Sequence, residues 1–429
     1  MPVKSGPQRL WPALLFVAML APLLIPAGAE AMVLVLSLIG ATGWAFAHFR
    51  SAQRFEWQRE DTWMACALAS MVLLQGLSVL WSQWPKQSAA SALKHLHFLL
   101  WPLLVWALSR VKQPQPWMER GLLVAMGLAV LWMLLPTQIG WAGGQFEAAA
   151  QNTSVLGKIV AVLGLWGMVL ASGMLRHARH AEVAERSLRW RSAMALVWGF
   201  GLLLLVAADR RIELALYVLL SLAFIMLRLF KRGQLRLALS ISCAVAVLMG
   251  LALSHQAERF AKAGQEVRQY FSAPQPSLQD YSTSLGQRLE MYHIAAKAIA
   301  DKPWLGWGAG SRPQYLKQYA HFPAQMFERT HFHSQYLQTL LDVGVLGSLL
   351  ACAALIVAWR VSVLQLWRRG EHELAMLFAS LYGVHMLSGV FNPAFSQGLS
   401  NSFFVTMAAI LWVIHRQHRT GRAQSSIPI

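Results

Sequence analysis

The chain has 429 residues, of which 56% are hydrophobic and only 13% are charged. Soluble domains carry about 25% charged residues, so this composition excludes a soluble globular domain and indicates a protein embedded in lipid. The formal net charge of +18 would suit a nucleic-acid-binding protein, but the basic residues gather in short linkers between apolar segments. That distribution is typical of linkers that face anionic headgroups, so we expect membrane lipids and no nucleic acid as partners.

Apolar segments close to the ~20 residues needed to cross a bilayer recur along most of the chain. They predict an all-α, polytopic membrane protein with about twelve transmembrane helices. The expected spans are 10–27, 29–48, 62–81, 93–109, 118–135, 153–174, 192–208, 212–230, 236–254, 336–359, 372–391 and 398–415. The three cysteines, Cys66, Cys243 and Cys352, each fall in such a segment, and we expect them to be buried small residues without disulfide or zinc chemistry.

Linkers rich in Lys and Arg alternate with linkers poor in them. The basic linkers are 50–59, 110–120, 176–191, 231–236, 360–369 and 416–422. By contrast, linkers 136–152 and 392–397 contain neither residue type. By the positive-inside rule, the basic linkers and both termini are expected in the cytoplasm.

One long hydrophilic stretch interrupts the apolar segments and divides the chain. We expect nine helices in 1–254, a large loop with short helices on the outer face in 255–335, three helices in 336–415 and a cytoplasmic tail in 416–429. Within the loop, 255–272 and 285–301 have helical patterns, separated by a turn-rich link at 274–287. A glycine run, Gly306, Gly308 and Gly310, follows Lys302-Pro303; its spacing fits no phosphate-binding motif, so a plain connecting turn is sufficient.

The junction between this loop and the tenth helix carries the sequence Thr-His-Phe-His-Ser-Gln-Tyr-Leu at 330–337. His333, Leu337, Leu340, Gly344, Gly347 and Ala351 share one helical stripe, whose small residues would let another helix approach closely. A histidine at the top of that stripe, with an ordinary pKa near ~6.5, could accept a proton from a hydroxyl nucleophile. An interfacial histidine that only hydrogen-bonds to headgroups is the alternative.

Two groups of arginines are further candidates for binding. Arg288 and Tyr292 share a helix face, and a guanidinium suits paired phosphate oxygens; a salt bridge with Glu290 or Asp280 is the alternative.

Arg210 and Arg211 stand at an outer helix end, against the positive-inside trend, where an anionic ligand would explain them. Pairing with Asp209 or Glu213 would also explain them.

No metal-ligand motif, P-loop or nucleotide-binding glycine pattern is present. We therefore expect neither a metal nor a cofactor, and a group that is transferred must arrive already activated.

Together these features resemble the O-antigen ligase and polymerase superfamily, whose members are membrane-embedded glycosyltransferases of the GT-C type. The resemblance lies in the helix arrangement, in Arg288 followed by the Pro-x-x-Gly-x-Gly run from Pro303, and in the His-Ser-x-Tyr-Leu-x-x-Leu-x-x-x-Gly-x-x-Gly helix start at His333. The family's usual His-Asn is His-Ser here. Its usual Ser-Arg is Asp209-Arg210-Arg211, so either arginine could match, and we favour Arg210.

The resemblance implies an O-antigen ligase in the bacterial inner membrane with its site on the periplasmic side. Such an enzyme transfers polysaccharide from undecaprenyl diphosphate to a sugar hydroxyl of lipid A–core, with inversion and without a metal. On this chain, His333 would activate the acceptor hydroxyl, while Arg210 or Arg211 and Arg288 would hold the donor diphosphate. Supporting roles would fall to Tyr292, His331 and Tyr336.

Two other functions stay open. An O-antigen polymerase would share the topology and the outer arginines, although the helix start at His333 and the single large outer loop favour a ligase. A secondary transporter or a flippase for a lipid-linked sugar would also have about twelve helices. Carriers often show two similar halves around a central linker, and this chain shows neither feature.

Overall fold

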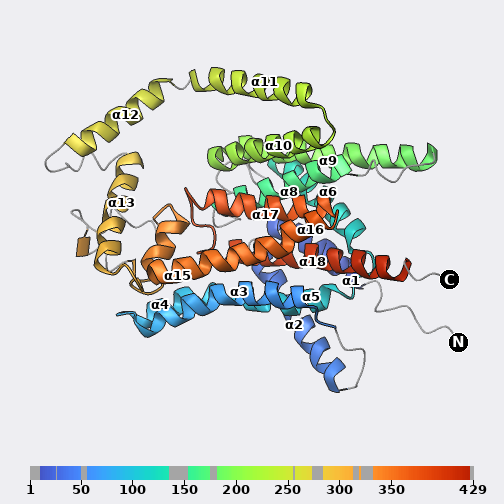
Figure 1. Ribbon diagram of the computed structural model, residues 1–429, viewed down its shortest axis with the longest axis horizontal. Helices are drawn as coiled ribbons and strands as arrows, with labels where there is room; N and C mark the ends of the chain where they lie inside the picture. The colour runs from blue at the N-terminus through green and yellow to red at the C-terminus, as the bar shows by residue number, and fades with distance from the viewer. Residues whose placement is uncertain are drawn as a thin grey trace.

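The computed structural model describes residues 10–25, 27–49, 56–134, 153–173, 181–254, 257–272, 284–312, 318–319 and 332–425. Within these ranges the secondary structure is helical and no strand occurs, which confirms the all-α prediction. In the labels of Figure 1 the α-helices are α1 Leu10–Leu24, α2 Gly28–Phe49, α3 Arg59–Leu77, α4 Pro85–Leu93, α5 Trp101–Leu108, α6 Pro114–Leu134, α8 Thr153–Gly173, α9 Ala181–Ala207, α10 Arg211–Lys231, α11 Leu235–Ser254, α12 Ala257–Ser272, α13 Ser284–Asp301, α15 Gln335–Trp359, α16 Gln365–Arg368, α17 His372–Ser388 and α18 Gly398–Ser425.

Every predicted span coincides with a helix, but the helices differ in length. Among the described residues, eight helices are long and apolar enough to cross a membrane. A ninth span arises if α4 is joined to Leu96–Leu108, the two parts being bent by 42°. The other three predicted spans correspond to α1 with 15 residues, α17 with 17 residues and the apolar stretch Leu235–Ala244 of α11. By length and composition, the structure therefore supports a polytopic protein with eight or nine full-length spans.

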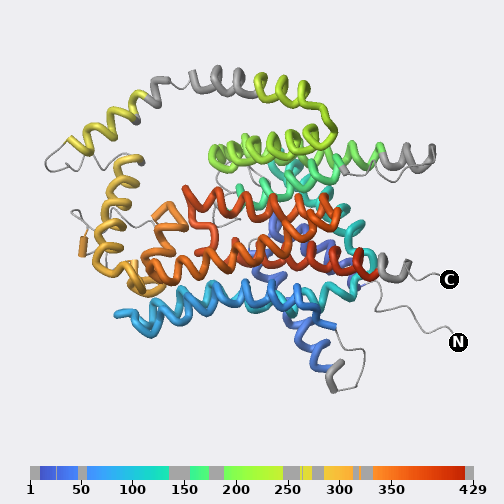
Figure 2. The backbone as a smooth tube through the Cα atoms, viewed as in Figure 1, coloured from blue at the N-terminus to red at the C-terminus, as the bar shows by residue number. Residues whose placement is uncertain are grey.

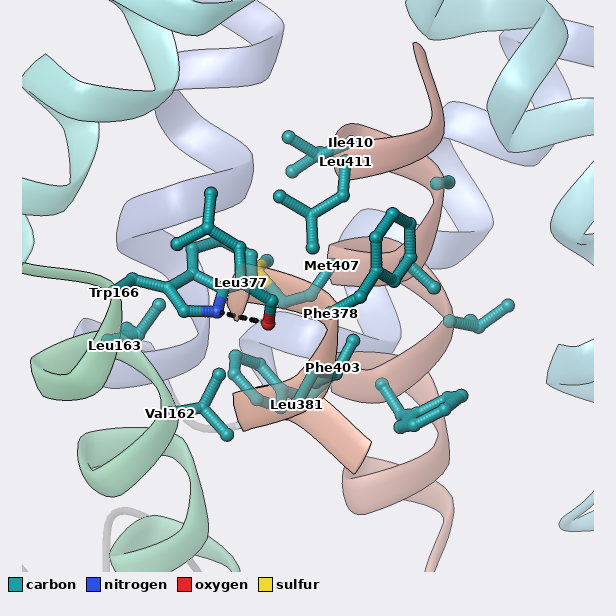
Figure 3. Packing of buried hydrophobic residues seen from close by; sticks show 14 of the residues in the cluster. Val162, Leu163, Trp166, Leu377, Phe378, Leu381, Phe403, Met407, Ile410 and Leu411 are labelled. Carbon is teal, nitrogen blue, oxygen red and sulfur yellow. Dashed lines mark hydrogen bonds between the residues drawn. The ribbon is translucent and has the colours of Figure 1, made fainter. Parts of the chain in front are cut away.

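The core of the bundle surrounds α18, in which every residue from Asn401 to Ile414 is buried. A helix enclosed on all sides occupies the centre of a bundle. Figure 3 shows α8 and α17 packed beside it, with the indole nitrogen of Trp166 donating a hydrogen bond to the carbonyl oxygen of Leu377 at 3.1 Å. Phe403 and Met407 of α18 complete this contact.

The predicted burial of the cysteines was wrong, because Cys66, Cys243 and Cys352, all free thiols, are exposed on the surface of the protein. In a membrane, lipid tails are as apolar as the protein core. An apolar run therefore indicates a span without telling which of its side chains face inward.

The bundle has two chemically different ends. Figure 1 shows α12 and α13 at the end where α10 and α15 begin, and the finish of α18 at the opposite end. At that opposite end Glu60 accepts hydrogen bonds from Arg369 and Arg419, at 2.7 and 3.2 Å, and Arg416 pairs with Asp61. Basic residues of the linkers 360–369 and 416–422, both expected in the cytoplasm, therefore lie at the same end of the bundle.

After α10 the chain leaves the bundle and then returns to it. Figure 2 traces α11 back along α10, and then α12 and α13 down to the region where α15 starts. The hydroxyl of Tyr270 on α12 donates a hydrogen bond to the carboxylate of Glu290 on α13 at 2.9 Å. The two helices predicted within the large loop are therefore present, and they are joined by a buried contact.

The glycine run after α13 is more than a connecting turn, because it fills a break in α15. At Gly344 the backbone has φ 66° and ψ −170°, which interrupts the helix. The amides of Trp307 and Gly308 donate hydrogen bonds to the carbonyls of Leu341 and Asp342, at 2.7 and 3.0 Å. In return, Val345 and Leu346 donate to the carbonyls of Pro303 and Trp304. These bonds satisfy the backbone groups that the break exposes, as a low-dielectric environment requires.

The predicted stripe of small residues is consequently not continuous. A Cβ on Gly344 would lie 2.3 Å from the carbonyl oxygen of Trp304, so this glycine admits the loop backbone and not another helix. Farther along the helix, Ala351 lines a small cavity with Met71 and Leu74 of α3. Thr339 and Val343, on the other side of the break, line the same cavity, so α3 lies beside both halves of α15.

Replacing Gly344 with alanine should reduce the free energy of unfolding by roughly 3 kcal/mol or more, since the required backbone region is essentially restricted to glycine and the loop leaves no room for a methyl group. Thermal unfolding of the purified protein in detergent measures the change. The matched control is Gly127→Ala, because no atom lies within 4 Å of a Cβ at that position of α6. An equal melting temperature for both variants would contradict the interpretation of the break.

Candidate functional site

The start of α15 holds His333 in an unusual backbone conformation. Its φ is +51°, a left-handed value that histidine adopts more readily than most residues. Ser334 is the N-cap, and its hydroxyl oxygen accepts a hydrogen bond from the amide of Leu337. Asn and Ser are both strong N-cap residues, so the departure from the His-Asn pattern preserves the local geometry. His333 is half-buried, directly before the first turn.

Gln335 joins the start of α15 to the loop 389–397 between α17 and α18. Its side-chain oxygen accepts hydrogen bonds from the amides of Ala394 and Phe395 at 3.0 and 2.8 Å, and from the hydroxyl of Ser396 at 3.1 Å. Its own amide donates to the carbonyl of Gly389 at 2.7 Å. Several bonds to one buried side chain make this junction rigid, and they fix the position of the neighbouring His333.

Arg210 lies at the start of α10 and faces into the bundle. Arg210 is the N-cap, with a non-helical backbone of φ −89° and ψ 72°, whereas the adjacent Arg211 is the first residue of the helix. Arg210 and Glu213 both pack against Gly157 of α8, where a Cβ would lie 2.9 Å from the Cγ of Glu213 and 3.3 Å from the Cγ of Arg210. Glu213 is buried, with 3% of its surface exposed. Arg210 is thus held beside a buried carboxylate.

A buried lysine completes this charged cluster. Lys158 on α8 is fully buried and donates a hydrogen bond to the carbonyl of Pro393 at 2.7 Å. Asn392 donates to the carboxylate of Glu213 at 3.4 Å, and Lys158 and Arg210 both interact electrostatically with that carboxylate. Two cations face one anion here, so the cluster has a net positive charge and would favour an anionic ligand.

Arg211 points elsewhere. Its guanidinium forms two hydrogen bonds to the Asp209 carboxylate, at 2.9 and 3.1 Å, and both side chains are exposed. The alternative explanation by ion pairing therefore applies to Arg211, and Arg210 is the arginine directed toward the charged cluster.

Arg288 is carried by α13, which packs directly beside the residue before His333. Met291, Ile294 and Ala298 on one face of α13 form a hydrophobic cluster with Phe332 and with residues of the loop and α15. Arg288 and Tyr292 are half-buried near the start of this helix. Glu290 accepts a hydrogen bond from Tyr270, and Asp280, the other partner considered for Arg288, lies outside the described residues.

One loop supports both the Arg210 cluster and the start of α15. The loop 389–397 contacts both the Arg210 cluster, through Asn392 and Pro393, and the start of α15, through Gln335. Tyr336 is exposed, and its hydroxyl donates to the carbonyl of Met386 at 2.7 Å, which supports the helix start. The predicted His331 lies outside the described residues.

Sequence reasoning overlooked Lys158 and the role of Gln335. An isolated lysine within an apolar run is costly in a membrane, and such residues are functional candidates by default, so Lys158 had a recognisable signal. The contacts of Gln335 depend on a loop some sixty residues later in the chain, and no local pattern marks them.

Comparison with known proteins gives one family match. Residues 194–352 match a family model described as O-Antigen ligase. This range includes Arg210, Arg288 and His333. No curated protein gives a match to this chain.

Proposed function

We propose that this protein is an O-antigen ligase, a function supported by the match of residues 194–352 to a family model described as O-Antigen ligase. It transfers O-antigen polysaccharide from undecaprenyl diphosphate to a sugar hydroxyl of lipid A–core. It resides in the bacterial inner membrane with both termini in the cytoplasm, and its site opens on the periplasmic side. The observation that carries this proposal is the loop 389–397, which supports both the Arg210 cluster and the start of α15 beside His333.

The donor diphosphate is held by Arg210 and Arg288. A guanidinium binds two phosphate oxygens at once, and the net positive cluster around Lys158 and Glu213 increases the attraction for an anion. As the bond between the anomeric carbon and the phosphate oxygen breaks, negative charge accumulates on the diphosphate. Fixed cations close to that oxygen stabilise the transition state.

His333 accepts the proton of the acceptor hydroxyl. The acceptor oxygen attacks the anomeric carbon from the face opposite the diphosphate, so a new glycosidic bond forms as the old bond breaks and the configuration inverts. The hydroxyl proton passes to the imidazole, and undecaprenyl diphosphate is released. The donor is already activated, so the reaction consumes no nucleotide.

Arg288→Lys tests the role of the guanidinium fork. We expect transfer to fall at least about tenfold although the charge is kept, because a charge-assisted hydrogen bond contributes about 1.5–3 kcal/mol and an ammonium cannot grip two oxygens in the same way. The rate is measured at saturating acceptor. Lys297→Gln, at an exposed position of the same helix, is the control and should keep the wild-type rate. Wild-type activity in Arg288→Lys would remove this residue from the proposal.

A deletion strain distinguishes ligase from polymerase. Loss of a ligase leaves long lipid-linked polymer in the membrane while lipid A–core stays bare. Loss of a polymerase leaves lipid A–core capped by single repeat units. We expect the first result, restored by the wild-type gene, and the second would overturn the assignment in favour of the polymerase.

A further inference from the structure

A cavity lies beside the loop 389–397. It has a volume of about 540 Å³ and is formed by the α1–α2 turn, the end of α4, the start of α8 and the start of α18. Its polar lining includes Glu30, Lys94, His97 and Gln397, and its apolar lining includes Leu34 and Leu93. The two leucines are 62% and 59% exposed. In a bilayer these exposed leucines face lipid, so the cavity opens toward the membrane.

The backbone at Lys94 fixes the polar wall of this cavity. The carbonyl of Lys94 accepts a hydrogen bond from the buried Asn401 at 2.9 Å, and Nδ1 of His97 lies 3.1 Å from the same oxygen. A carbonyl oxygen only accepts, so Nδ1 carries a proton; in the imidazolium form Nε2 of His97 carries the second proton and can donate to a phosphate oxygen. The Lys94 side chain itself is exposed.

Glu30 supplies an acceptor close to His97, because both side chains lie within 4 Å of the position that a Cβ on Gly398 would occupy. Its carboxylate oxygen lies 2.5 Å from the position that a Cβ on Gly398 would occupy, so only glycine leaves the carboxylate in place there. The cavity thus presents an ammonium and an imidazole together with a carboxylate. The two basic groups suit a phosphate, whereas the carboxylate suits sugar hydroxyls and disfavours a simple anionic headgroup.

The cavity shares a wall with the proposed reaction site. Ser396 lines the cavity, and its hydroxyl donates to the side chain of Gln335, two residues after His333. A lipid headgroup bound in the cavity would therefore have its sugars next to the start of α15.

We propose that this cavity binds the phosphate-bearing headgroup of the acceptor glycolipid, with Lys94 and His97 on a phosphate, Glu30 on sugar hydroxyls and the acyl chains along Leu34 and Leu93. This inference rests on the proposed function, because it assigns the second substrate of that reaction. The donor diphosphate is held by other residues, so acceptor binding and donor binding are separately measurable.

The test uses the full-length protein in nanodiscs of zwitterionic lipid. Binding of phosphorylated lipid A–core and of its dephosphorylated form is measured by native mass spectrometry. We expect the wild-type protein to prefer the phosphorylated form about tenfold, equivalent to ~1.4 kcal/mol, and Lys94→Gln to lose this preference. Lys86→Gln, at an exposed lysine near the start of α4, the helix that Lys94 follows, is the matched control and should keep it. Lys94 holds Asn401 through its backbone carbonyl, so the substitution leaves that support intact.

Two results would overturn the inference. The first is equal preference in Lys94→Gln and the wild-type protein; the second is competition by phosphatidylglycerol at the same concentration as lipid A–core, which would indicate a general anionic-lipid site. Failure of the proposed function has a different signature. In that case the wild-type protein would bind phosphorylated lipid A–core selectively and yet form no transfer product.

Discussion

Replacing His333 with alanine should lower the rate of polysaccharide transfer by a factor of ~10²–10⁴, the contribution expected of a general base. The histidine stands directly before the first turn of α15, next to the Gln335 junction that fixes it. Its side chain is half-buried at the surface of the bundle, so its removal should leave membrane insertion intact. Transfer is measured with purified lipid-linked donor and lipid A–core.

A second substitution separates chemistry from backbone strain at His333. Alanine is disfavoured at φ +51°, whereas asparagine adopts left-handed conformations readily. His333→Asn should therefore unfold at the wild-type temperature, yet it cannot accept the proton and should be as inactive as His333→Ala. Substantial activity in the asparagine variant would mean that the side chain orients the hydroxyl by hydrogen bonding and takes no proton.

Arg210→Gln should reduce transfer by ~10²–10³, as expected when a charge-stabilising group of a transition state is removed. The adjacent Arg211→Gln should change the rate little, because an exposed ion pair contributes only about 0–1 kcal/mol and Arg211 is engaged with Asp209. These neighbours form a matched pair with the same charge and opposite orientation. Initial transfer rates of the two variants provide the comparison.

A control for folding is needed at Arg210, because its charge also faces the buried Glu213. Arg210→Lys keeps a cation beside that carboxylate and should keep the wild-type melting temperature while losing most of the activity. Equal rates in the two glutamine variants, or a greater loss in Arg211→Gln, would contradict the assignment of Arg210 to the diphosphate.

The helices were predictable because bilayer thickness and the cost of unpaired backbone groups leave few alternatives. The break at Gly344 was not predictable by the same means. The residues around it have a continuous helical pattern, and only the backbone of 303–308, distant in sequence, supplies the hydrogen bonds that stabilise the break. Gly344 therefore correctly indicated that another part of the chain approaches closely, but the sequence did not show that this part is the loop backbone at Trp304.

The residue types of the candidate site could be predicted from the sequence, but the directions and contacts of their side chains could not. Arg210 and Arg211 are adjacent, but Arg210 is a non-helical N-cap and Arg211 begins the helix, a backbone difference that composition does not encode. The loop 389–397 has no charged residue, so nothing in it suggested a functional role. It acts through its backbone groups, which bind Lys158 and Gln335.

The central claim is that this protein joins an activated, lipid-linked polysaccharide to lipid A–core with its own arginines as the counter-charge. Reconstitution of the purified protein with both lipids, in the presence of a metal chelator and without nucleotide, tests it most directly. The account predicts a new lipid A–core–polysaccharide product of inverted configuration, absent with His333→Asn. Movement of labelled lipid-linked polysaccharide across the membrane without formation of that bond would contradict it and indicate a carrier.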